Sequence, residues 1–459
     1  MKQLTERERM AKRLPTYRIR DFDEVELGFT EDQAIREASR DIRFCKASCM
    51  LGCPVGVNIP GMLRLVAEGK YEEAYRQLIK KSPFPAITGR VCPQERQCEM
   101  FCVLAKAGKP ISIGAIERFV GDWALANNVK EEATIKPNGL KVAVVGSGPA
   151  SIVVASDLAR LGYSIDMFEE SHMAGGVLVY GIPEFRLPKE IVRKEVQRLK
   201  DLGVNIRLGV PVGTAITVGE LAMEYDAVFL GVGAGHPKFL NVPGENLLNV
   251  YTANEFLTRA NLMKGYKFPE YDTPLHVGKR VAVIGAGNTA MDSVRTAKRL
   301  GAEEAIVVYR RSREEMPARA EEVLNAEEEG IKFEFLLEPI ELLSNDKRMV
   351  SGIKLMKMKI IESSNGERRA VVPTGDTTQL DVDTVITAVG FNPNPSLKIG
   401  TNGLDTDDMG RIKVDGQGRT SLKGVYAGGD IVTGEGTVIE AMGWGRRAST
   451  AINEDLSVR

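Results

Sequence analysis

The stretch from Val142 to Ser151 constrains the fold more than any other part of the chain. Its first four residues are apolar, a short run that is typical of a parallel strand buried on both faces. Gly146 then allows a tight turn, and Gly148 lets the backbone approach a phosphate group. A helix that begins at Pro149-Ala150 would direct free N–H groups at that phosphate. The stretch predicts a dinucleotide-binding loop in a doubly wound α/β fold, although Ser151 replaces the usual third glycine.

Residues further along the chain support a flavin dinucleotide at this loop. The next apolar run ends at Glu169, 23 residues after Gly146, where a carboxylate binds adenosine ribose hydroxyls. Gly176 would let the backbone lie against a flat ligand. Near the end of the chain, a strand stops at two glycines and Asp430, which would bind a ribityl chain, and a helix from about Thr437 would point its N-terminus at the flavin ring. The alternative is a set of ordinary turns without a nucleotide.

A second strand and glycine loop begins at Arg280, with Gly285, Gly287 and Asn288 in the loop, 139 residues after the first. Two such units are far more specific than one. The strand that follows ends in Arg310-Arg311, not in an acid, and two cations suit the 2′-phosphate of NADPH. We therefore predict FAD at the first loop and NADPH at the second, against the alternative of a solvated basic turn.

All six cysteines lie between Cys45 and Cys102. Such a grouping inside a cell indicates metal ligation rather than disulfides. The two interleaved groups favour iron–sulfur clusters, with zinc or buried thiols as the alternatives; they consist of Cys45, Cys49 and Cys53, then Cys92, Cys98 and Cys102. Because no cysteine follows Cys102, the chain lacks the redox pair of a flavin disulfide reductase.

Charge and hydropathy restrict the possible partners. The net charge of -1 gives no reason to expect nucleic acid or a membrane surface, and no apolar run reaches spanning length. The charged beginning of the chain is unlike a signal peptide, so we expect a cytoplasmic protein. Residues 1–40 are polar, with a helix capped by Thr30, and form either a solvated arm or a partner-binding one. Residues 314–330 are expected to form an acidic helix on the surface.

Together these motifs resemble the small-subunit family of NADPH-dependent glutamate synthase. Its relatives include the large subunit of NADH-dependent reduced ferredoxin:NADP oxidoreductase and the N-terminal half of dihydropyrimidine dehydrogenase. The segments that carry the resemblance are Thr88 to Cys98, Ile113 to Phe119, Tyr180 to Pro188, Tyr309 to Pro317 and Ala427 to Gly434. The resemblance implies a helical iron–sulfur domain at 1–135, an FAD domain at 136–248 and 389–459, and an NADPH domain inserted at 249–388.

The resemblance also implies roles for single residues. Cys53, Cys92 and Cys98 would bind one 4Fe-4S cluster, with Glu117 as a non-cysteine fourth ligand. A second cluster would use Cys49, Cys102 and two earlier positions, which fall on Asp41 and Phe44; Cys45 lies one place away and would replace one ligand, with Asp41 as the fourth. One cluster is therefore expected, and the second is expected to be altered, more labile or absent. The implied FAD residues are Glu169, Arg186, Asp430 and Thr437, and the implied NADPH residues are Ala286, Thr289, Arg310 and Arg311.

The expected activity is electron transfer between NADPH, FAD, 4Fe-4S clusters and a partner redox subunit, in either direction. Hydride transfer is the cofactors' own chemistry, so no catalytic acid or base is assigned. The expected partner in a hetero-oligomer is a glutamate synthase large subunit, a ferredoxin reductase-like subunit, a hydrogenase-like subunit or ferredoxin. One alternative is a degenerate electron-carrying or scaffold subunit. A complete glutamate synthase is disfavoured, because Met1-Lys2 offers no N-terminal cysteine nucleophile.

Overall fold

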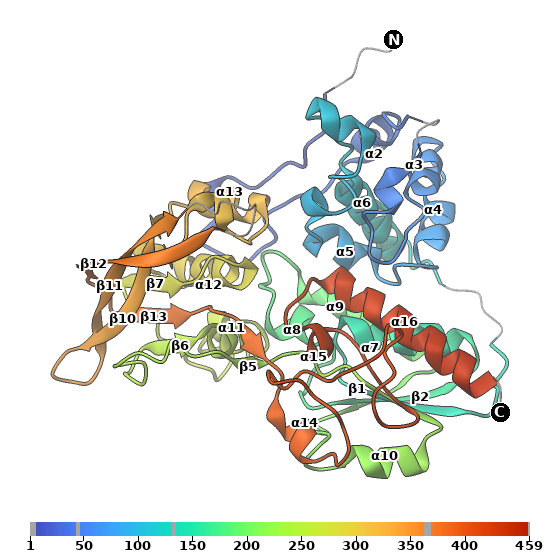
Figure 1. The fold of residues 1–459 in the computed structure, drawn as a ribbon. Helices are drawn as coiled ribbons and strands as arrows, with labels where there is room; N and C mark the ends of the chain where they lie inside the picture. The colour runs from blue at the N-terminus through green and yellow to red at the C-terminus, as the bar shows by residue number, and fades with distance from the viewer. Residues whose placement is uncertain (1–5, 43–45, 131–134, 362–368, 458–459) are drawn as a thin grey trace.

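The computed structural model describes residues 6–42, 46–130, 135–361 and 369–457. The chain forms a helical lobe and two α/β lobes, each built on a five-stranded parallel sheet (Figure 1). This arrangement confirms the predicted α/β class with an N-terminal helical region. The first sheet takes strands from two separate parts of the chain, because β15 returns to it after the second sheet is complete.

The helical lobe depends on glycines that let two helices approach closely. An added Cβ at Gly89 would lie 2.4 Å from the Arg118 backbone nitrogen, and one at Gly121 would lie 2.3 Å from that of Ala86. The predicted cap of Thr30 is confirmed, since its hydroxyl accepts from the Gln33 N–H. The helices before the first sheet are α1 (Pro15–Arg18), α2 (Glu31–Ala38), α3 (Ile59–Ala67), α4 (Tyr71–Leu78), α5 (Pro85–Val91) and α6 (Ile113–Ala126), with short 3-10 turns η1 (Ser48–Met50), η2 (Gln94–Arg96) and η3 (Val103–Ala107).

The first parallel sheet has the strand order β15-β4-β1-β2-β3. Alternate residues of its central strand serve two cores: Val142 and Val144 belong to the core that contains α7 and α16, whereas Ala143 and Val145 face α10 and α14. Its elements are β1 (Lys141–Val145), α7 (Pro149–Arg160), β2 (Ser164–Glu169), α8 (Val177–Tyr180), α9 (Lys189–Asp201), β3 (Asn205–Leu208), α10 (Val218–Glu224), β4 (Ala227–Leu230), α14 (Pro395–Ile399), β15 (Val425–Ala427), α15 (Asp430–Thr433) and α16 (Val438–Ser457).

The second parallel sheet has the order β6-β13-β7-β8-β9, and its strands all fall within residues 249–388. Helices pack on one face, and the antiparallel sheet β10-β11-β12 covers the other. Its elements are β6 (Val250–Thr252), α11 (Ala253–Asn261), η4 (Gly265–Lys267), β7 (Arg280–Ile284), α12 (Asn288–Arg299), β8 (Glu304–Tyr309), η5 (Arg313–Glu315), α13 (Ala320–Glu328), β9 (Lys332–Phe335), β10 (Leu337–Ser344), β11 (Val350–Ile361), β12 (Ala370–Leu380) and β13 (Thr384–Thr387). A small pair, β5 (His236–Pro237) with β14 (Phe391–Asn392), lies where the chain passes between the lobes. The domain boundaries themselves stay a prediction.

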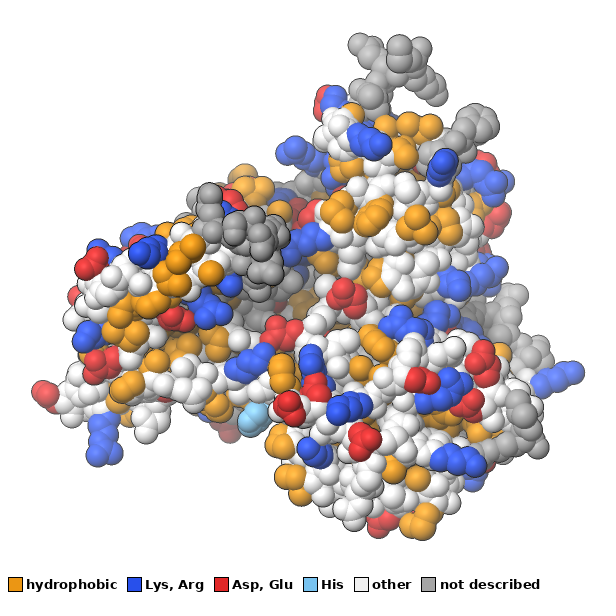
Figure 2. Space-filling view, in the orientation of Figure 1, with side chains coloured by type: hydrophobic (Ala, Val, Ile, Leu, Met, Phe, Trp, Pro, Cys, Tyr) orange, Lys and Arg blue, Asp and Glu red, His pale blue; other side chains and the backbone are white. Residues whose placement is uncertain are grey.

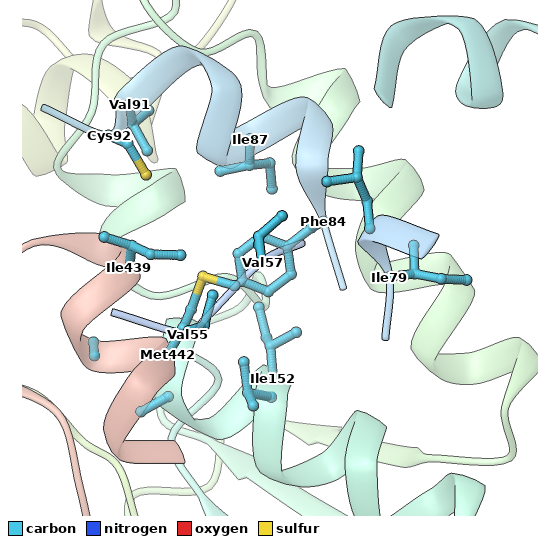
Figure 3. Packing of buried hydrophobic residues seen from close by; sticks show 14 of the residues in the cluster. Val55, Val57, Ile79, Phe84, Ile87, Val91, Cys92, Ile152, Ile439 and Met442 are labelled. Atoms are coloured by element: carbon cyan, nitrogen blue, oxygen red, sulfur yellow. The ribbon is translucent and has the colours of Figure 1, made fainter. Parts of the chain in front are cut away.

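One hydrophobic core joins the helical lobe to the first α/β lobe. Figure 3 shows Phe84 and Ile87 of the helical lobe beside Ile152 of α7 and Met442 of α16. These side chains are buried, so no water layer separates the two lobes here.

We expected the N-terminal arm to be either solvated or free to bind a partner. At Arg18 it is neither, because this residue is buried within the protein. That side chain is fully buried and bonds to Glu329 and Glu328 of the second α/β lobe, with N···O distances of 2.8 and 2.9 Å. The expected surface helix over 314–330 is also wrong in part, because α13 begins only at Ala320 and Glu322 and Glu329 are buried. Arginines neutralise these acids, which makes their burial tolerable.

Acidic and basic side chains are interspersed over the face shown in Figure 2, and the molecule is hollowed between the two α/β lobes. Within the described part of the chain, no helix is long and apolar enough to cross a membrane.

Candidate nucleotide cleft and cysteine cavity

A cleft of about 1320 Å³ lies between the two α/β lobes, and both glycine loops line it. The structure brings every predicted nucleotide-binding residue to its walls: Gly146, Gly148, Pro149, Ala150, Glu169, Gly176, Arg186, Gly285, Ala286, Gly287, Asn288, Thr289, Arg310, Arg311, Asp430 and Thr437. Because the carboxyl ends of parallel strands meet at one sheet edge, residues distant in sequence converge there. Their individual contacts to a nucleotide stay a prediction.

The first loop has the backbone that a pyrophosphate site requires. Gly146 has a φ of +86°, and an added Cβ would lie 2.6 Å from the carbonyl oxygen of Gly231. Gly148 is the N-cap residue of α7, and an added Cβ there would meet nothing nearer than 3.9 Å. Gly176 packs against this turn, since its added Cβ would lie 2.9 Å from the Gly148 Cα. The turn is closed behind and open toward the cleft, which fits FAD.

Ser151 is accommodated without loss of the close helix–strand contact. It is fully buried, and its hydroxyl lies 3.4 Å from the carbonyl oxygens of Val145 and Gly231. An added Cβ at Gly231 would come within 2.2 Å of the Ser151 hydroxyl oxygen. The space of the missing third glycine is therefore supplied by another glycine, Gly231, directly after the neighbouring strand β4.

The carboxylate of Glu169 is held in place by the loop itself. It accepts from the Ser147 N–H at 3.0 Å, from the Ser147 hydroxyl at 2.5 Å and from the Ser171 N–H at 2.8 Å. The same hydroxyl accepts from the Gly175 N–H at 2.8 Å. Ser147 thus links the phosphate loop to the acid, and the sequence pattern alone did not single it out.

Asp430 lies at the start of α15, directly after Gly429, whose φ is +81°. Burial raises the pKa of Asp430 to about 7, and the nearby carboxylates of Glu435 and Glu440 add to the shift. Thr437 lies 3.4 Å from the Gln97 side-chain nitrogen, so the helical lobe reaches the edge of the cleft. A carboxyl that is partly protonated near neutral pH can donate as well as accept a hydrogen bond, which suits a hydroxyl-rich ribityl chain.

Arg186 connects the two α/β lobes. Its guanidinium donates to both carboxylate oxygens of Asp292 on α12, at 2.7 and 2.8 Å, and lies 3.2 Å from Glu322. Burial raises the pKa of Asp292 to about 6, although Arg186 opposes that shift. The side chain lines the cleft, but its charge is already paired within the protein.

The second loop repeats the geometry of the first. Gly285 has a φ of +126°, and an added Cβ would lie 2.3 Å from the carbonyl oxygen of Ala388. The two arginines beyond β8 differ: Arg310 is 59% exposed and lies 3.3 Å from Glu338, whereas Arg311 is 13% exposed and lies 3.1 Å from Glu315. Arg310 is therefore the more accessible cation for a phosphate group.

Three cysteines and one acid line a small second cavity in the helical lobe: Cys53, Cys92, Cys98 and Glu117. The Glu117 carboxylate accepts from the Thr88 hydroxyl at 2.6 Å, and burial raises its pKa to about 7. Burial also raises the pKa of the Cys92 and Cys98 thiols. Glu117, the implied non-cysteine ligand, lines the same cavity as the three thiols.

This donor set is chemically suited to an iron–sulfur cluster. Among the described residues, no three side chains of His, Cys, Asp or Glu converge closely enough to hold one metal ion. The cavity that these residues line is small, with a volume of about 20 Å³. Three thiolates and a carboxylate are chemically appropriate ligands for iron.

Cys49 and Cys102 lie in the same helical lobe. The Ser48 hydroxyl donates to the Phe101 carbonyl oxygen at 2.8 Å, which brings the segments of Cys49 and Cys102 together. Both thiols are buried. Cys45 and Phe44 lie outside the described residues, so the ligand set of a second cluster stays a prediction.

The cleft and the cysteine cavity share a wall. Val91 and Pro93 line the cleft, while Cys92 between them lines the cavity. On α16, Val438 lines the cleft and Ile439 the cavity. Figure 3 shows Val91, Cys92 and Ile439 close to one another at the boundary between the lobes.

Comparison with known proteins agrees with this arrangement. Residues 140–454 match the pyridine nucleotide-disulphide oxidoreductase family, and residues 18–129 match dihydropyrimidine dehydrogenase domain II, a 4Fe-4S cluster domain. The chain is 36% identical over 447 residues to the glutamate synthase (NADPH) small chain of Escherichia coli, which covers 95% of this chain and 94% of the relative. It is also 36% identical over 439 residues to the NADP(+)-dependent formate dehydrogenase subunit beta of Moorella thermoacetica, covering 90% of this chain and 60% of the relative.

Among solved structures, FprA of Mycobacterium tuberculosis in complex with NADPH has a TM-score of 0.59 at 23% identity, covering 70% of this chain and 85% of that one. That likeness concerns the fold alone. The sequence matches extend over both the cysteine lobe and the nucleotide lobes. This chain therefore belongs to the family of glutamate synthase small chains, NADPH-dependent oxidoreductases that carry FAD and 4Fe-4S clusters.

Proposed function

We propose that this chain is the NADPH-oxidising subunit of a larger redox complex. The loop at Gly285 binds NADPH, the loop at Gly146 binds FAD, and the cavity of Cys53, Cys92, Cys98 and Glu117 holds a 4Fe-4S cluster. The shared wall at Cys92 carries the proposal, because it brings two kinds of redox site into contact. When bound, NADPH and FAD supply hydride transfer and the cluster supplies one-electron transfer.

The protein's own residues position these groups and exclude water. Glu169 presents a fixed carboxylate to the cleft, and the Arg186–Asp292 pair ties the two nucleotide lobes together. Phe84 and Ile87 are buried in the hydrophobic core that joins the helical lobe to the first α/β lobe. A dry, preorganised boundary keeps reduced cofactors from side reactions with solvent.

The partner is proposed to dock over the segments of Cys49 and Cys102. Three large apolar side chains next to these cysteines are exposed: Leu51 by 82%, Met100 by 55% and Phe101 by 43%. Contiguous exposed apolar groups mark protein interaction sites, and the two segments meet here, since a Cβ added at Gly52 would lie 2.6 Å from the Phe101 ring. The names of two relatives describe subunits, a glutamate synthase small chain and a formate dehydrogenase subunit beta, which supports a redox subunit as the partner.

The test is an anaerobic titration of the purified protein. NADPH should bleach the flavin absorbance, and iron analysis should give about four atoms per chain for one cluster or about eight for two. Cys92→Ser should lower the iron content while flavin bleaching persists, and electron transfer to a one-electron acceptor should fall. Met62→Leu is the matched control, since Met62 lines the same cavity but is not one of the proposed cluster ligands. A protein whose bound flavin does not respond to NADPH would contradict the proposal.

A further inference from the structure

The accessible cation of the NADPH loop has an acidic neighbour. Arg310 Nη1 lies 3.3 Å from Glu338 Oε1, and the two side chains are 59% and 38% exposed. Both residues line the cleft, so the pair faces the space that a nucleotide would occupy. The second cation, Arg311, does not offset the negative charge of Glu338, because it is paired with Glu315 and only 13% exposed.

The fold holds Glu338 at this place from outside the parallel sheet. Strand β9 runs beside β8 with Phe335 opposite Tyr309, so both strands end at the cleft. Leu336 then adopts a left-handed φ of +57°, and its N–H donates to the Arg311 carbonyl oxygen at 3.2 Å. The chain reverses there into β10, whose second residue is Glu338. An acid 28 residues after Arg310 thus reaches the end of β8.

We propose that Glu338 is a specificity-determining residue that weakens the preference of the site for NADPH over NADH. The inference rests on the proposed binding of a dinucleotide at the Gly285 loop. A 2′-phosphate beside Arg310 brings a charge of about −1.5 to −2 next to the Glu338 carboxylate, which repels it. A ribose 2′-hydroxyl would instead donate a hydrogen bond to that carboxylate. Glu338 therefore acts against the phosphate and in favour of the hydroxyl.

The test compares Glu338→Gln with the wild-type protein by calorimetric titration. Glutamine keeps the shape of the side chain and removes its charge. Because the partly screened repulsion between this charge and the 2′-phosphate is lost, NADP⁺ should bind about tenfold more tightly. NAD⁺ should bind equally or more weakly, and the fragments 2′,5′-ADP and 5′-AMP should show the same divergence. Glu341→Gln is the matched control, because Glu341 lies on the same strand but outside the cleft.

The outcomes separate this inference from the proposed function. If the wild-type protein binds neither NADP⁺ nor NAD⁺, both are overturned. If it binds NADP⁺ and Glu338→Gln changes the ratio of the two Kd values by less than about twofold, the role of Glu338 is overturned and the proposed function stands. If Glu341→Gln changes the ratio by the same factor, the role of Glu338 is also contradicted, since the change would then reflect general surface charge.

Discussion

At the scale of single residues, Asp430 makes the stability of the flavin-free protein depend on pH. Burial raises its pKa from 3.8 to about 7, so the unfolded chain loses this proton at a lower pH than the folded protein. The folded state therefore loses stability as the pH rises from about 4 to about 7, and the loss is complete above that range. Asp430→Asn should remove this contribution.

The measurement is the Tm of flavin-free protein at pH 5 and pH 7.5 for both proteins. The Tm of the variant relative to the wild type should rise by about 2 °C or more between these pH values. Other buried acids titrate in both proteins and cancel in the difference. A difference that is constant with pH would mean that Asp430 is ionised in the fold.

Gly285 offers a second test, which separates backbone strain from steric contact. An added Cβ meets the Ala388 carbonyl oxygen at 2.3 Å, whereas at Gly301, with a similar positive φ of +107°, it meets nothing within 4 Å. Gly301→Ala should lower the free energy of unfolding by about 1 kcal/mol. Gly285→Ala should lower it by about 2 kcal/mol or more and also weaken NADP⁺ binding. Equal losses in urea unfolding would show that the contact with Ala388 relaxes freely.

The sequence was most informative about residues whose requirements are local. The glycine loops could be located because a tight turn after a strand needs glycine at Gly146 and Gly285 whatever surrounds it. The partners of Arg186 and Glu169 could not be predicted. Asp292 is 106 residues from Arg186, and Ser147 is 22 residues from Glu169 in the sequence. Such pairs depend on tertiary packing, which has no local pattern.

At the scale of secondary-structure elements, the contact between α5 and α6 positions the cysteine cavity. The cavity takes Cys92 from the end of α5 and Glu117 from α6. Gly89→Ala would place a Cβ 2.4 Å from the Arg118 backbone nitrogen and push the helices apart. We expect a loss of about 1–3 kcal/mol in the free energy of unfolding, together with a lower iron content.

A glycine in another helix provides the control for this prediction. Gly219→Ala in α10 adds a Cβ that meets only the Thr217 hydroxyl oxygen, at 3.9 Å, and should stabilise the protein slightly. Both variants are compared by urea unfolding and iron analysis. Retention of iron in a destabilised Gly89→Ala protein would show that the cavity tolerates a wider helix spacing.

Element boundaries were harder to predict where a single residue changes direction. The run from Phe333 to Leu337 has the composition of one strand, but it is divided between β9 and β10 by the left-handed Leu336. Leucine carries no signal for this conformation, because it is uncommon for residues other than glycine and asparagine. The position of Glu338 follows from that turn, and so the acid beside Arg310 could not be predicted from the chain.

At the scale of the whole molecule, three lobes are connected by buried arginines. Arg319 of the second α/β lobe donates to the Arg90 carbonyl oxygen at 2.8 Å and to the Gln94 side chain at 3.1 Å in the helical lobe. Arg186 joins the two α/β lobes. The N-terminal arm adds Arg18, which reaches Glu329 beside Arg295. These contacts resist relative motion of the lobes, because separation would leave buried charges without partners.

Arg18 therefore stabilises the assembled molecule far more than an exposed arginine of the same N-terminal region. Arg18→Met removes a fully buried partner of Glu329 and should lower the free energy of unfolding by about 3 kcal/mol. Arg36→Met is the control, because Arg36 is 57% exposed in its pair with Glu8 and should change stability by less than about 1 kcal/mol. Hydrogen exchange should accelerate in both the arm and α13 of the Arg18 variant. If exchange accelerates in the arm alone, Arg295 and Arg299 suffice to hold Glu329, and the arm is attached to the second lobe without stabilising it.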